Sequence, residues 1–152
     1  MNELILCHAL IGALFGADQL LKRKAQAMEK GKVKELPLGL RFTRSFNRGA
    51  AMNLGQEVPG MVALSSGLVL VAAEAALLYR CLKGKKDLTA AGLTLMVGGA
   101  ASNVYDRFRK GGVTDYIRFT TGRKKLDETV FNLGDFAIFA GALLTGAGDW
   151  DI

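Results

Sequence analysis

The sequence predicts an all-α membrane protein, a bundle of four transmembrane helices with a small β-sheet outside the bilayer. Glycine is frequent and proline scarce, 19 residues against 2 among 152, which suits closely packed membrane helices. A period-2 apolar pattern in the first long polar connection indicates a strand. Four apolar segments approach the ~20 residues that a bilayer core requires. They lie at about residues 3–21, 61–79, 88–105 and 130–148.

We expect the first segment to be a retained membrane span. It has no basic start, and Asp18 follows its apolar run in place of a small-residue cleavage site, so the segment does not resemble a secretory signal. The second segment contains Glu74, a lone carboxylate in mid-span for which the sequence offers no partner. The length of the chain fits one integral membrane domain, 1–152.

Strands are expected in the two longer polar connections. Between Lys22 and Pro59, apolar residues at every second position indicate a half-buried strand. In the connection over residues 106–129, an extended Val113–Phe119 would place Asp115 on an otherwise apolar face. Together these segments predict a small sheet. The alternating residues of the first connection are Leu36, Leu38, Leu40 and Phe42.

The basic residues lie in the connections. All 20 Lys and Arg residues do so, nine in Lys22–Arg48, four in Arg80–Lys86 and seven in Arg107–Lys125, and the net charge is +6. The positive-inside rule places the two long basic loops in the cytoplasm. No nucleic-acid-binding motif accompanies them, so we expect contact with anionic lipid headgroups and none with nucleic acid.

Cysteine and histidine are too few for a metal centre. Cys7 and Cys81 lie in or beside apolar segments, far apart in the chain, without the spacing of a metal site or a disulfide framework. We expect both to be buried, inert thiols. His8 stands alone among apolar residues and is expected to pack between helices. We therefore predict no metal and no cofactor.

Polar residues at helical spacing are predicted to gather at one membrane boundary. Residues three or four apart share one face of a helix, and the sets below fall at the ends of three expected spans. A soluble protein would scatter such groups over its surface. The sets are Asn132 with Asp135, Asn103 with Asp106 and Arg107, and Asp18 with Lys22.

Asp115 and Asp135 are the candidates for chemistry. An ionisable group at membrane depth costs at least ~2.5 kcal/mol and usually marks function. An apolar setting raises the pKa of a carboxyl group, and a second carboxyl nearby raises one of the pair further, so the two share one proton. The ionised member then takes a proton from water while the protonated member donates one. Unless His8 serves a nucleophile, this is the hydrolytic option that the residues allow.

The same residues also admit plainer interpretations. Asp115 fits a loop residue that makes a turn bond. Asp135 fits the start of a helix, where the dipole favours a carboxylate. For the others, the plain interpretations are a local salt bridge for Asp106 and Arg107, a structural i,i+4 pair for Asp18 and Lys22, and a turn for Asn47 and Gly49.

Five motifs, in order along nearly the whole chain, resemble those of the lipoprotein signal peptidase (signal peptidase II) family of bacterial membrane aspartyl proteases. Any one motif is weak evidence, but five in the same order form a specific signal. They are Asp18-Gln19-Leu20-Leu21-Lys22 for D-Q-x-x-K, Asn47-Arg48-Gly49-Ala50-Ala51 for N-x-G-A-A, the run from Gly98 to Arg107 for G-G-A-x-G-N-x-x-D-R, Val113-Thr114-Asp115-Tyr116 for V-V-D-F, and Phe131-Asn132-Leu133-Gly134-Asp135 for F-N-x-A-D.

The resemblance implies roles for individual residues. Asp115 and Asp135 would be the catalytic pair. Four residues would orient the pair or hold the substrate backbone, namely Asn47, Asn103, Arg107 and Asn132. Four more would be structural, namely Asp18, Lys22, Gly49 and Asp106.

The resemblance also implies a setting and a substrate. The protein would be a multi-pass protein of the bacterial cytoplasmic membrane, with an extracytoplasmic sheet and an active site near that face. Its substrate would be a prolipoprotein with a diacylglyceryl-modified cysteine, cut just before that cysteine. Membrane lipids would be its other partners, and we expect a monomer.

The chain departs from the family's pattern at several positions. The carboxylates and amides are retained, so we expect the chemistry to persist. Two other functions stay open: a catalytically silent relative that binds lipoproteins or lipids through the same groove, and a soluble helical bundle. The departures are Ser102 for Gly, Gly134 for Ala, Met52 for an aromatic residue, and Thr114 and Tyr116 beside Asp115.

Overall fold

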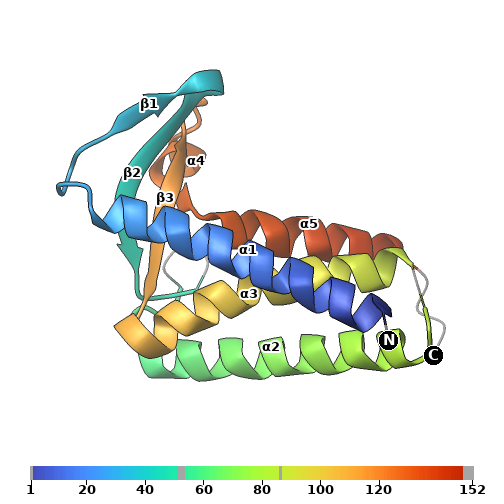
Figure 1. Cartoon of the computed structure of the whole chain (residues 1–152). Helices are drawn as coiled ribbons and strands as arrows, with labels where there is room; N and C mark the ends of the chain where they lie inside the picture. Colours follow the sequence, from blue (N-terminus) through green and yellow to red (C-terminus); the bar gives the residue numbers. More distant parts are fainter. Residues whose placement is uncertain (1, 51–53, 86, 149–152) are drawn as a thin grey trace.

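Four long helices lie side by side, and a small sheet stands at one end of them (Figure 1). The computed structural model describes residues 2–50, 54–85 and 87–148. The protein is therefore mainly helical with a small antiparallel sheet, as predicted. The four helices are α1 (Asn2–Gln26), α2 (Pro59–Leu82), α3 (Leu88–Lys110) and α5 (Leu133–Ala147).

The helix bounds differ from the predicted spans mainly at the sheet end. Helix α1 continues to Gln26 and α3 to Lys110, beyond the apolar segments; Lys22 and Asp106 near these ends are fully buried, and Gln26 donates to the hydroxyl of Thr114. The predicted start of the last span at residue 130 is wrong. Val130–Phe131 forms strand β4, and α5 begins at Leu133 after the cap residue Asn132.

Helix α3 is the centre of the bundle and packs against α1, α2 and α5. Its buried side chains are mostly small or polar, which explains why it is less apolar than α1 and α2 although it is surrounded by protein. Glycines bring α3 and α5 close together. A Cβ atom on Gly99 would collide with the carbonyl oxygen of Gly134, and one on Gly92 would collide with Gly141. The expected close packing through glycine is therefore present.

Helices α1 and α2 have the length and composition of membrane spans. Within the described ranges they are the two helices that meet this test, and α5 is a shorter apolar helix. Their large apolar side chains point outward, among them Leu10 at 54% and Leu68 at 64% exposure. Such an apolar surface fits contact with lipid. The count of four spans stays a prediction.

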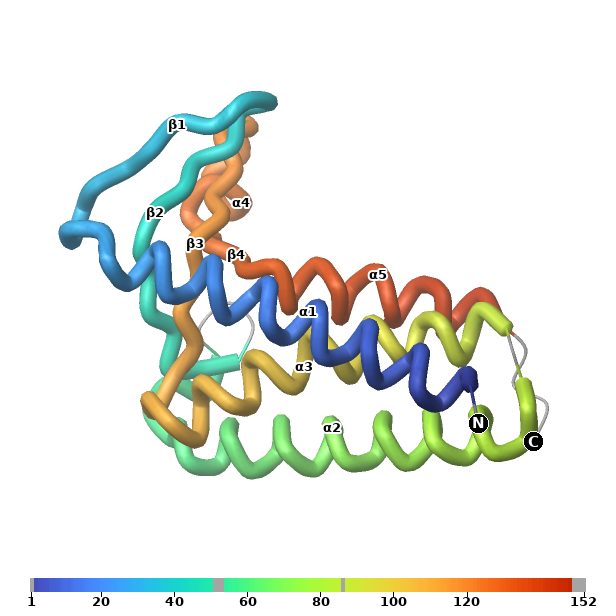
Figure 2. The backbone as a smooth tube through the Cα atoms, viewed as in Figure 1, coloured from blue at the N-terminus to red at the C-terminus, as the bar shows by residue number. Residues whose placement is uncertain are grey.

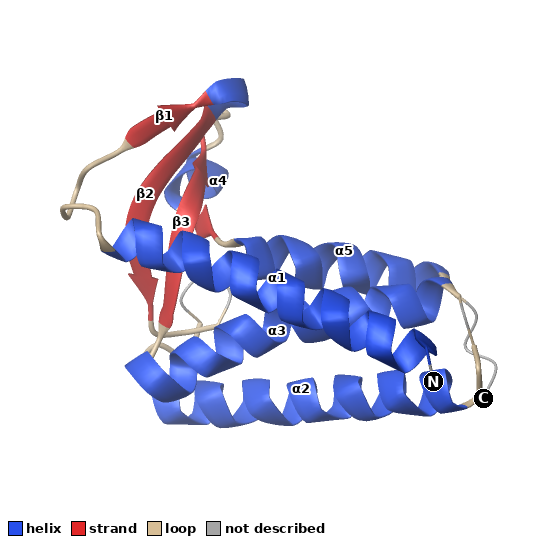
Figure 3. Ribbon diagram, in the orientation of Figure 1, coloured by secondary structure: helices blue, strands red, loops and turns tan. Residues whose placement is uncertain are grey.

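The sheet has four antiparallel strands in the order β1-β2-β3-β4. Figure 3 shows that the strands run across the direction of the helices, and Figure 2 shows how the last strand leads directly into α5. The predicted extended segment over 113–119 is confirmed as β3. The strands are β1 (Lys34–Leu36), β2 (Leu40–Asn47), β3 (Val113–Phe119) and β4 (Val130–Phe131).

The predicted continuous strand through Leu36, Leu38 and Phe42 is wrong at its centre. Residues Pro37–Gly39 form a one-turn 3-10 helix, η1, that turns the chain from β1 into β2. Leu38 adopts φ 63° there and is 96% exposed, so the apolar alternation crosses a turn and does not mark one strand. A second short helix, α4 (Lys124–Glu128), lies in the connection between β3 and β4.

Candidate active site

A cavity of about 560 Å³ lies where the helices meet the sheet. Side chains of α2 and α5 line it from two sides, and α3 contributes residues between them. Most of the lining is apolar, including Val69, Leu70, Ile138 and Phe139. The polar lining residues include Asn47, Asn103, Arg107, Asp115 and Asp135, five of the residues singled out in the sequence.

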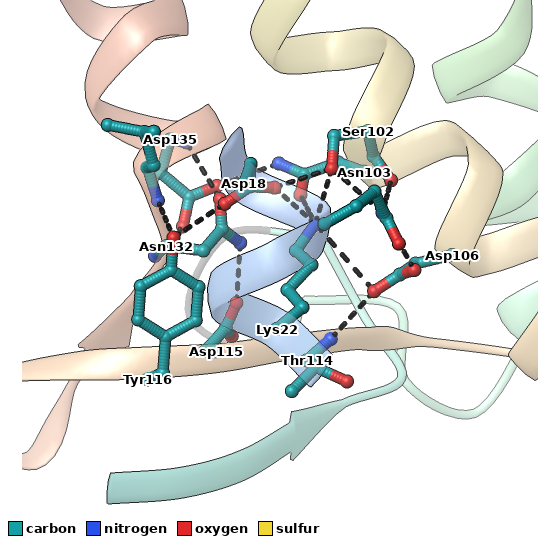
Figure 4. Close-up of polar contacts among 12 residues, drawn as sticks. Asp18, Lys22, Ser102, Asn103, Asp106, Thr114, Asp115, Tyr116, Asn132 and Asp135 are labelled. Carbon is teal, nitrogen blue, oxygen red and sulfur yellow. Dashed lines mark hydrogen bonds and ion pairs between the residues drawn. The ribbon is translucent and has the colours of Figure 1, made fainter. Parts of the chain in front are cut away.

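Asp115 and Asp135 approach this cavity from different elements. Asp115 is in β3, paired with Ser45 of β2, and its side chain is 4% exposed. Asp135 is in the first turn of α5. Both carboxylates line the same cavity, so the structure brings the two candidate residues together. Figure 4 shows them around the residue that links them, Asn132.

Asn132 bonds to both aspartates. Its side-chain amide nitrogen donates to Oδ1 of Asp115 at 2.7 Å. Its side-chain oxygen accepts from the backbone N–H of Asp135 at 2.9 Å, while its own backbone N–H donates to Oδ2 of Asp135 at 3.0 Å. These two bonds form a capping box that starts α5. The plain interpretation of Asp135 as a helix-start residue is therefore correct, and compatible with a place in the cavity.

The pKa of Asp115 lies far above its ordinary value. Burial raises the pKa most, the charge of Asp135 raises it further, and the hydrogen bond from Asn132 works in the opposite direction, with the result at about 7. Asp115 is thus able to hold a proton near neutral pH. A carboxyl group of this kind can donate a proton to a reacting group.

A second polar cluster lies behind the cavity, centred on the fully buried Lys22. Its ammonium group pairs with Oδ2 of Asp18 at 2.7 Å and lies 3.7 Å from Oδ2 of Asp106. It also donates to the hydroxyl of Ser102 at 3.0 Å and to the side-chain oxygen of Asn103 at 2.8 Å. The predicted i,i+4 pair of Asp18 and Lys22 is confirmed, and it is part of a larger network.

Asn103 connects the two groups. Its oxygen accepts from Lys22, and its amide nitrogen donates to Oδ1 of Asp135 at 2.9 Å. Because Lys22 can only donate, this contact requires the oxygen of Asn103 to face it and turns the NH₂ group toward Asp135. The predicted convergence of these polar residues at one end of the bundle is confirmed.

The interpretation of Asp106 and Arg107 as a local salt bridge is wrong. Neighbouring residues of a helix point in different directions, and Asp106 pairs instead with Lys110 at 2.7 Å and faces Lys22. Arg107 donates to the carbonyl oxygen of Gly49 at 3.3 Å and lines the cavity.

The loop after β2 is ordered by Asn47. Its side-chain oxygen accepts from the N–H of Gly49 at 2.8 Å, and its amide donates to the carbonyl of Ala50 at 3.1 Å, so the predicted turn is present. Residues Ala51 and Met52, which belong to the motif and its departures, lie outside the described residues.

Three buried residues had no role assigned from the sequence. Gln19 donates to Asp106 at 3.1 Å and to Ser102 at 2.9 Å. Ser102 donates in turn to Asp18, and so does the hydroxyl of Tyr116. Ser102 and Tyr116 were visible only as departures from the family's pattern, and Gln19 only as a letter in a motif.

The far end of the bundle holds an ion pair between the buried Arg80 and Asp87, which do not line the cavity. Glu74, for which the sequence offered no partner, bonds to His8 at 2.8 Å across α1 and α2. His8 is an exposed residue on α1 and Cys7 and Cys81 are half-buried, so the expected burial of these side chains is incomplete. Among the described residues, no group of three His, Cys, Asp or Glu side chains is placed to hold a metal ion.

Two solved structures share this fold, and both are described as bacterial membrane enzymes. One aligns with a TM-score of 0.76 at 22% identity, covering 91% of this chain and 84% of its own. The other aligns with a TM-score of 0.71 at 24% identity, covering 93% and 90%. The arrangement of the helices and the small sheet is thus the fold of these two proteins.

This chain belongs to the signal peptidase II family: the family's sequence model, described as Signal peptidase (SPase) II, matches residues 10–147. It is 34% identical to the lipoprotein signal peptidase of Azoarcus sp. (strain BH72), over 87% of this chain and 75% of that protein. It is 36% identical to the lipoprotein signal peptidase of Shewanella sp. (strain MR-4), over 86% and 78%. The protein is therefore an aspartic-type endopeptidase of the signal peptidase II type.

Proposed function

We propose that this peptidase cuts prolipoproteins just before a diacylglyceryl-modified cysteine, with Asp115 and Asp135 as the pair that activates water. One observation carries the proposal: the two carboxylates line one largely apolar cavity and are joined through Asn132. Of the aspartates at this end of the bundle, these are the two that reach the cavity.

The surroundings of each carboxylate suggest its role. Asp115, with a pKa of about 7, holds a proton and donates it to the carbonyl oxygen or the leaving nitrogen of the peptide bond. Asp135 accepts hydrogen bonds from Asn103 and from the backbone of Asn132 at the positive end of the α5 dipole. These contacts favour its ionised form, which takes the proton from the attacking water.

Arg107 and Asn47 are placed to hold the substrate backbone. Both line the cavity, and the Nε atom of Arg107 is buried without a hydrogen-bond partner. A buried donor without an acceptor costs free energy, and a carbonyl oxygen of a bound peptide would supply the acceptor. Asn132 and Asn103 orient the aspartates, because each donates directly to one of them, and Asn47 also interacts with Asp115.

The apolar part of the cavity fits the lipid chains of the substrate. It is lined by residues of α2 and α5, among them Val69, Leu70 and Phe139. Phe139 is 67% exposed and Val69 62%, so this lining continues into the apolar outer surface. Acyl chains could therefore remain in contact with the bilayer while the peptide bond reaches the carboxylates.

The proposal includes a topology. The chain would form a single integral domain, 1–152, with α1, α2, α3 and α5 as four spans of the bacterial cytoplasmic membrane, and would act as a monomer. The sheet and the cavity would then lie at the extracytoplasmic face, although the basic loops oppose this orientation. Reporter fusions within residues 22–59 would test it, since a cytoplasmic location of this loop contradicts the proposed orientation.

The test is cleavage of a lipid-modified precursor by the purified protein in detergent. Asp115→Asn and Asp135→Asn should each abolish turnover while the protein stays folded. Asp127→Asn is the matched control, because Asp127 lies in α4 outside the cavity and should leave the rate unchanged. A near-normal rate in either of the first two variants overturns the dyad. Binding of lipidated peptide without product by the unaltered protein would identify the silent relative.

A further inference from the structure

The two faces of strand β3 have different surroundings. Asp115 points to the cavity, whereas its neighbour Tyr116 points to the opposite side, as alternation along a strand requires. The side chain of Tyr116 is fully buried, and its ring packs against Phe42 with the centroids 5.4 Å apart. Tyr116 therefore does not reach the cavity, and any influence on the reaction must pass through its contacts.

The hydroxyl of Tyr116 joins three elements. It donates to Oδ1 of Asp18 in α1 at 2.7 Å and accepts from the backbone N–H of Leu133 at 2.9 Å. Leu133 is the first residue of α5, and its N–H is one of the donors that a helix leaves unpaired. Asn132 and Asp135 lie one residue before and two residues after it. The hydroxyl thus ties the turn that carries both residues to α1.

Asp18 is a rigid anchor for this bond. Its other oxygen, Oδ2, accepts from the hydroxyl of Ser102 at 2.5 Å and from the ammonium of Lys22 at 2.7 Å. Asp18 itself is fully buried. Figure 4 shows Tyr116 and Ser102 approaching Asp18 from different sides. Both hydroxyls occur at positions where this chain departs from the family's pattern, which has Phe and Gly there.

We propose that Tyr116 is a positioning residue of the peptidase reaction, whose hydroxyl sets the first turn of α5 so that Asn132 holds Asp115 and Asp135 in their working arrangement. Ser102 supports it by fixing Asp18. This inference rests on the proposed role of the two aspartates. In this role Tyr116 connects α1 to Asp115 and Asp135 without itself touching the substrate.

The hydroxyl keeps its proton throughout the pH range of the reaction. Burial and the negative charge of Asp18 raise the pKa of Tyr116 well above its ordinary value. The bond to Asp18 is therefore present whenever the enzyme works, and Tyr116 does not titrate with the dyad.

Tyr116→Phe tests the inference because it keeps the ring and removes the hydroxyl. We expect kcat to fall about 10-fold with KM unchanged, because the aspartates lose alignment while the cavity keeps its lining. The pH dependence should also change, since the bond from Asn132 to Asp115 loosens and the alkaline limb moves to higher pH. Tyr105→Phe is the matched control, since Tyr105 lies on α3 with 42% exposure, outside the cavity lining.

A lower melting temperature alone, with kcat and the pH profile unchanged per folded molecule, would show that the hydroxyl is only structural and would overturn the inference. If Tyr116→Phe does not fold, Ser102→Gly serves as the test variant, because it removes the hydroxyl that fixes Asp18. A smaller loss of kcat at constant KM supports the inference, and an unchanged kcat contradicts it. An error in the dyad assignment itself is recognised separately: Asp115→Asn or Asp135→Asn would then keep near-normal turnover, whatever the result for Tyr116→Phe.

Discussion

Two pairs of aspartates lie at the same end of the bundle and differ in what faces them. Asp18 and Asp106 are fully buried against Lys22, and Asp106 also pairs with Lys110. Asp115 and Asp135 line the cavity and receive hydrogen bonds from asparagine and the backbone. The first pair forms ion pairs with lysine side chains, whereas the second is held by amides and backbone N–H groups and shares its cavity with Arg107.

This difference separates a structural role from a chemical one. A buried carboxylate next to a lysine stays ionised and cannot exchange a proton usefully. A buried carboxylate beside another carboxylate can gain and lose a proton near neutral pH, as the pKa of Asp115 at about 7 indicates. Asn103 joins the two pairs without transferring charge, because an amide orients but does not titrate.

Removing the cation should have the largest effect on stability. Lys22→Met leaves Asp18 and Asp106 buried without their shared partner, which costs about 3–5 kcal/mol of the free energy of unfolding. Unfolding in detergent measures the change. Lys24→Met, at an exposed position two residues on, is the control and should be nearly neutral. Adding Asp18→Asn to Lys22→Met should recover part of the loss, and strictly additive costs would contradict the shared neutralisation.

Separating α3 from α5 should disturb the link between the pairs. Gly99→Ala places a Cβ atom against the carbonyl oxygen of Gly134, so the helices must move apart and the bond from Asn103 to Asp135 is strained. We expect a loss of about 1–3 kcal/mol in stability and a lower kcat. Gly12→Ala, where nothing lies within 4 Å, should cost little. Equal behaviour of the two variants would show that this contact does not set the site.

The pH dependence of turnover should respond to the hydrogen bond that Asn132 donates to Asp115. Turnover needs the proton of Asp115 and should fall as the pH rises above about 7. Asn132→Ser keeps an oxygen to cap α5 but removes the amide that favours the ionised carboxylate, so the pKa of Asp115 rises. A bond worth about 1 kcal/mol moves the alkaline limb about 0.7 pH units upward. A shift to lower pH would be inconsistent with Asp115 as the proton donor.

The hydrogen-bonded pair of Glu74 and His8 should have the smallest effect on stability and turnover. Glu74→Gln removes a charge but retains a hydrogen bond to His8, in a pair that touches neither group of aspartates. Interhelical hydrogen bonds in membranes average about 0.6 kcal/mol, and we expect a smaller change here with unaltered turnover. Melting temperature and cleavage rate check this. A large loss of activity would mean that the far end is coupled to the cavity.

The sequence predicted the parts of the fold that local patterns determine. The apolar runs located the helices, and Val113–Phe119 is the strand that its alternation indicated. Helical spacing also predicted that the polar pairs Asn103 with Asp106 and Asp18 with Lys22 gather at one end of the bundle, and the structure brings them into contact there. The turn at Pro37–Gly39 shows where apolar alternation misleads, because the proline and glycine that mark this turn lie within the alternating residues.

The contacts that depend on tertiary placement could not be read from one sequence. His8 and Glu74 are 66 residues apart, and their pairing depends on how α1 and α2 align. The bond from Tyr116 to Asp18 similarly needs β3 to lie against α1. Spacing identifies which residues share a face of one element, but not which faces of different elements meet.

The direct test of the contrast between the aspartates is the titration of Asp115 itself. In protein labelled with ¹³C at the aspartate carboxyl groups, the signal that disappears in Asp115→Asn identifies this residue. The account predicts that its NMR shift titrates with a midpoint near 7. A midpoint near the ordinary value of 3.8 would mean that Asp115 is ionised at neutral pH and holds no proton to give, which contradicts the proposed chemistry.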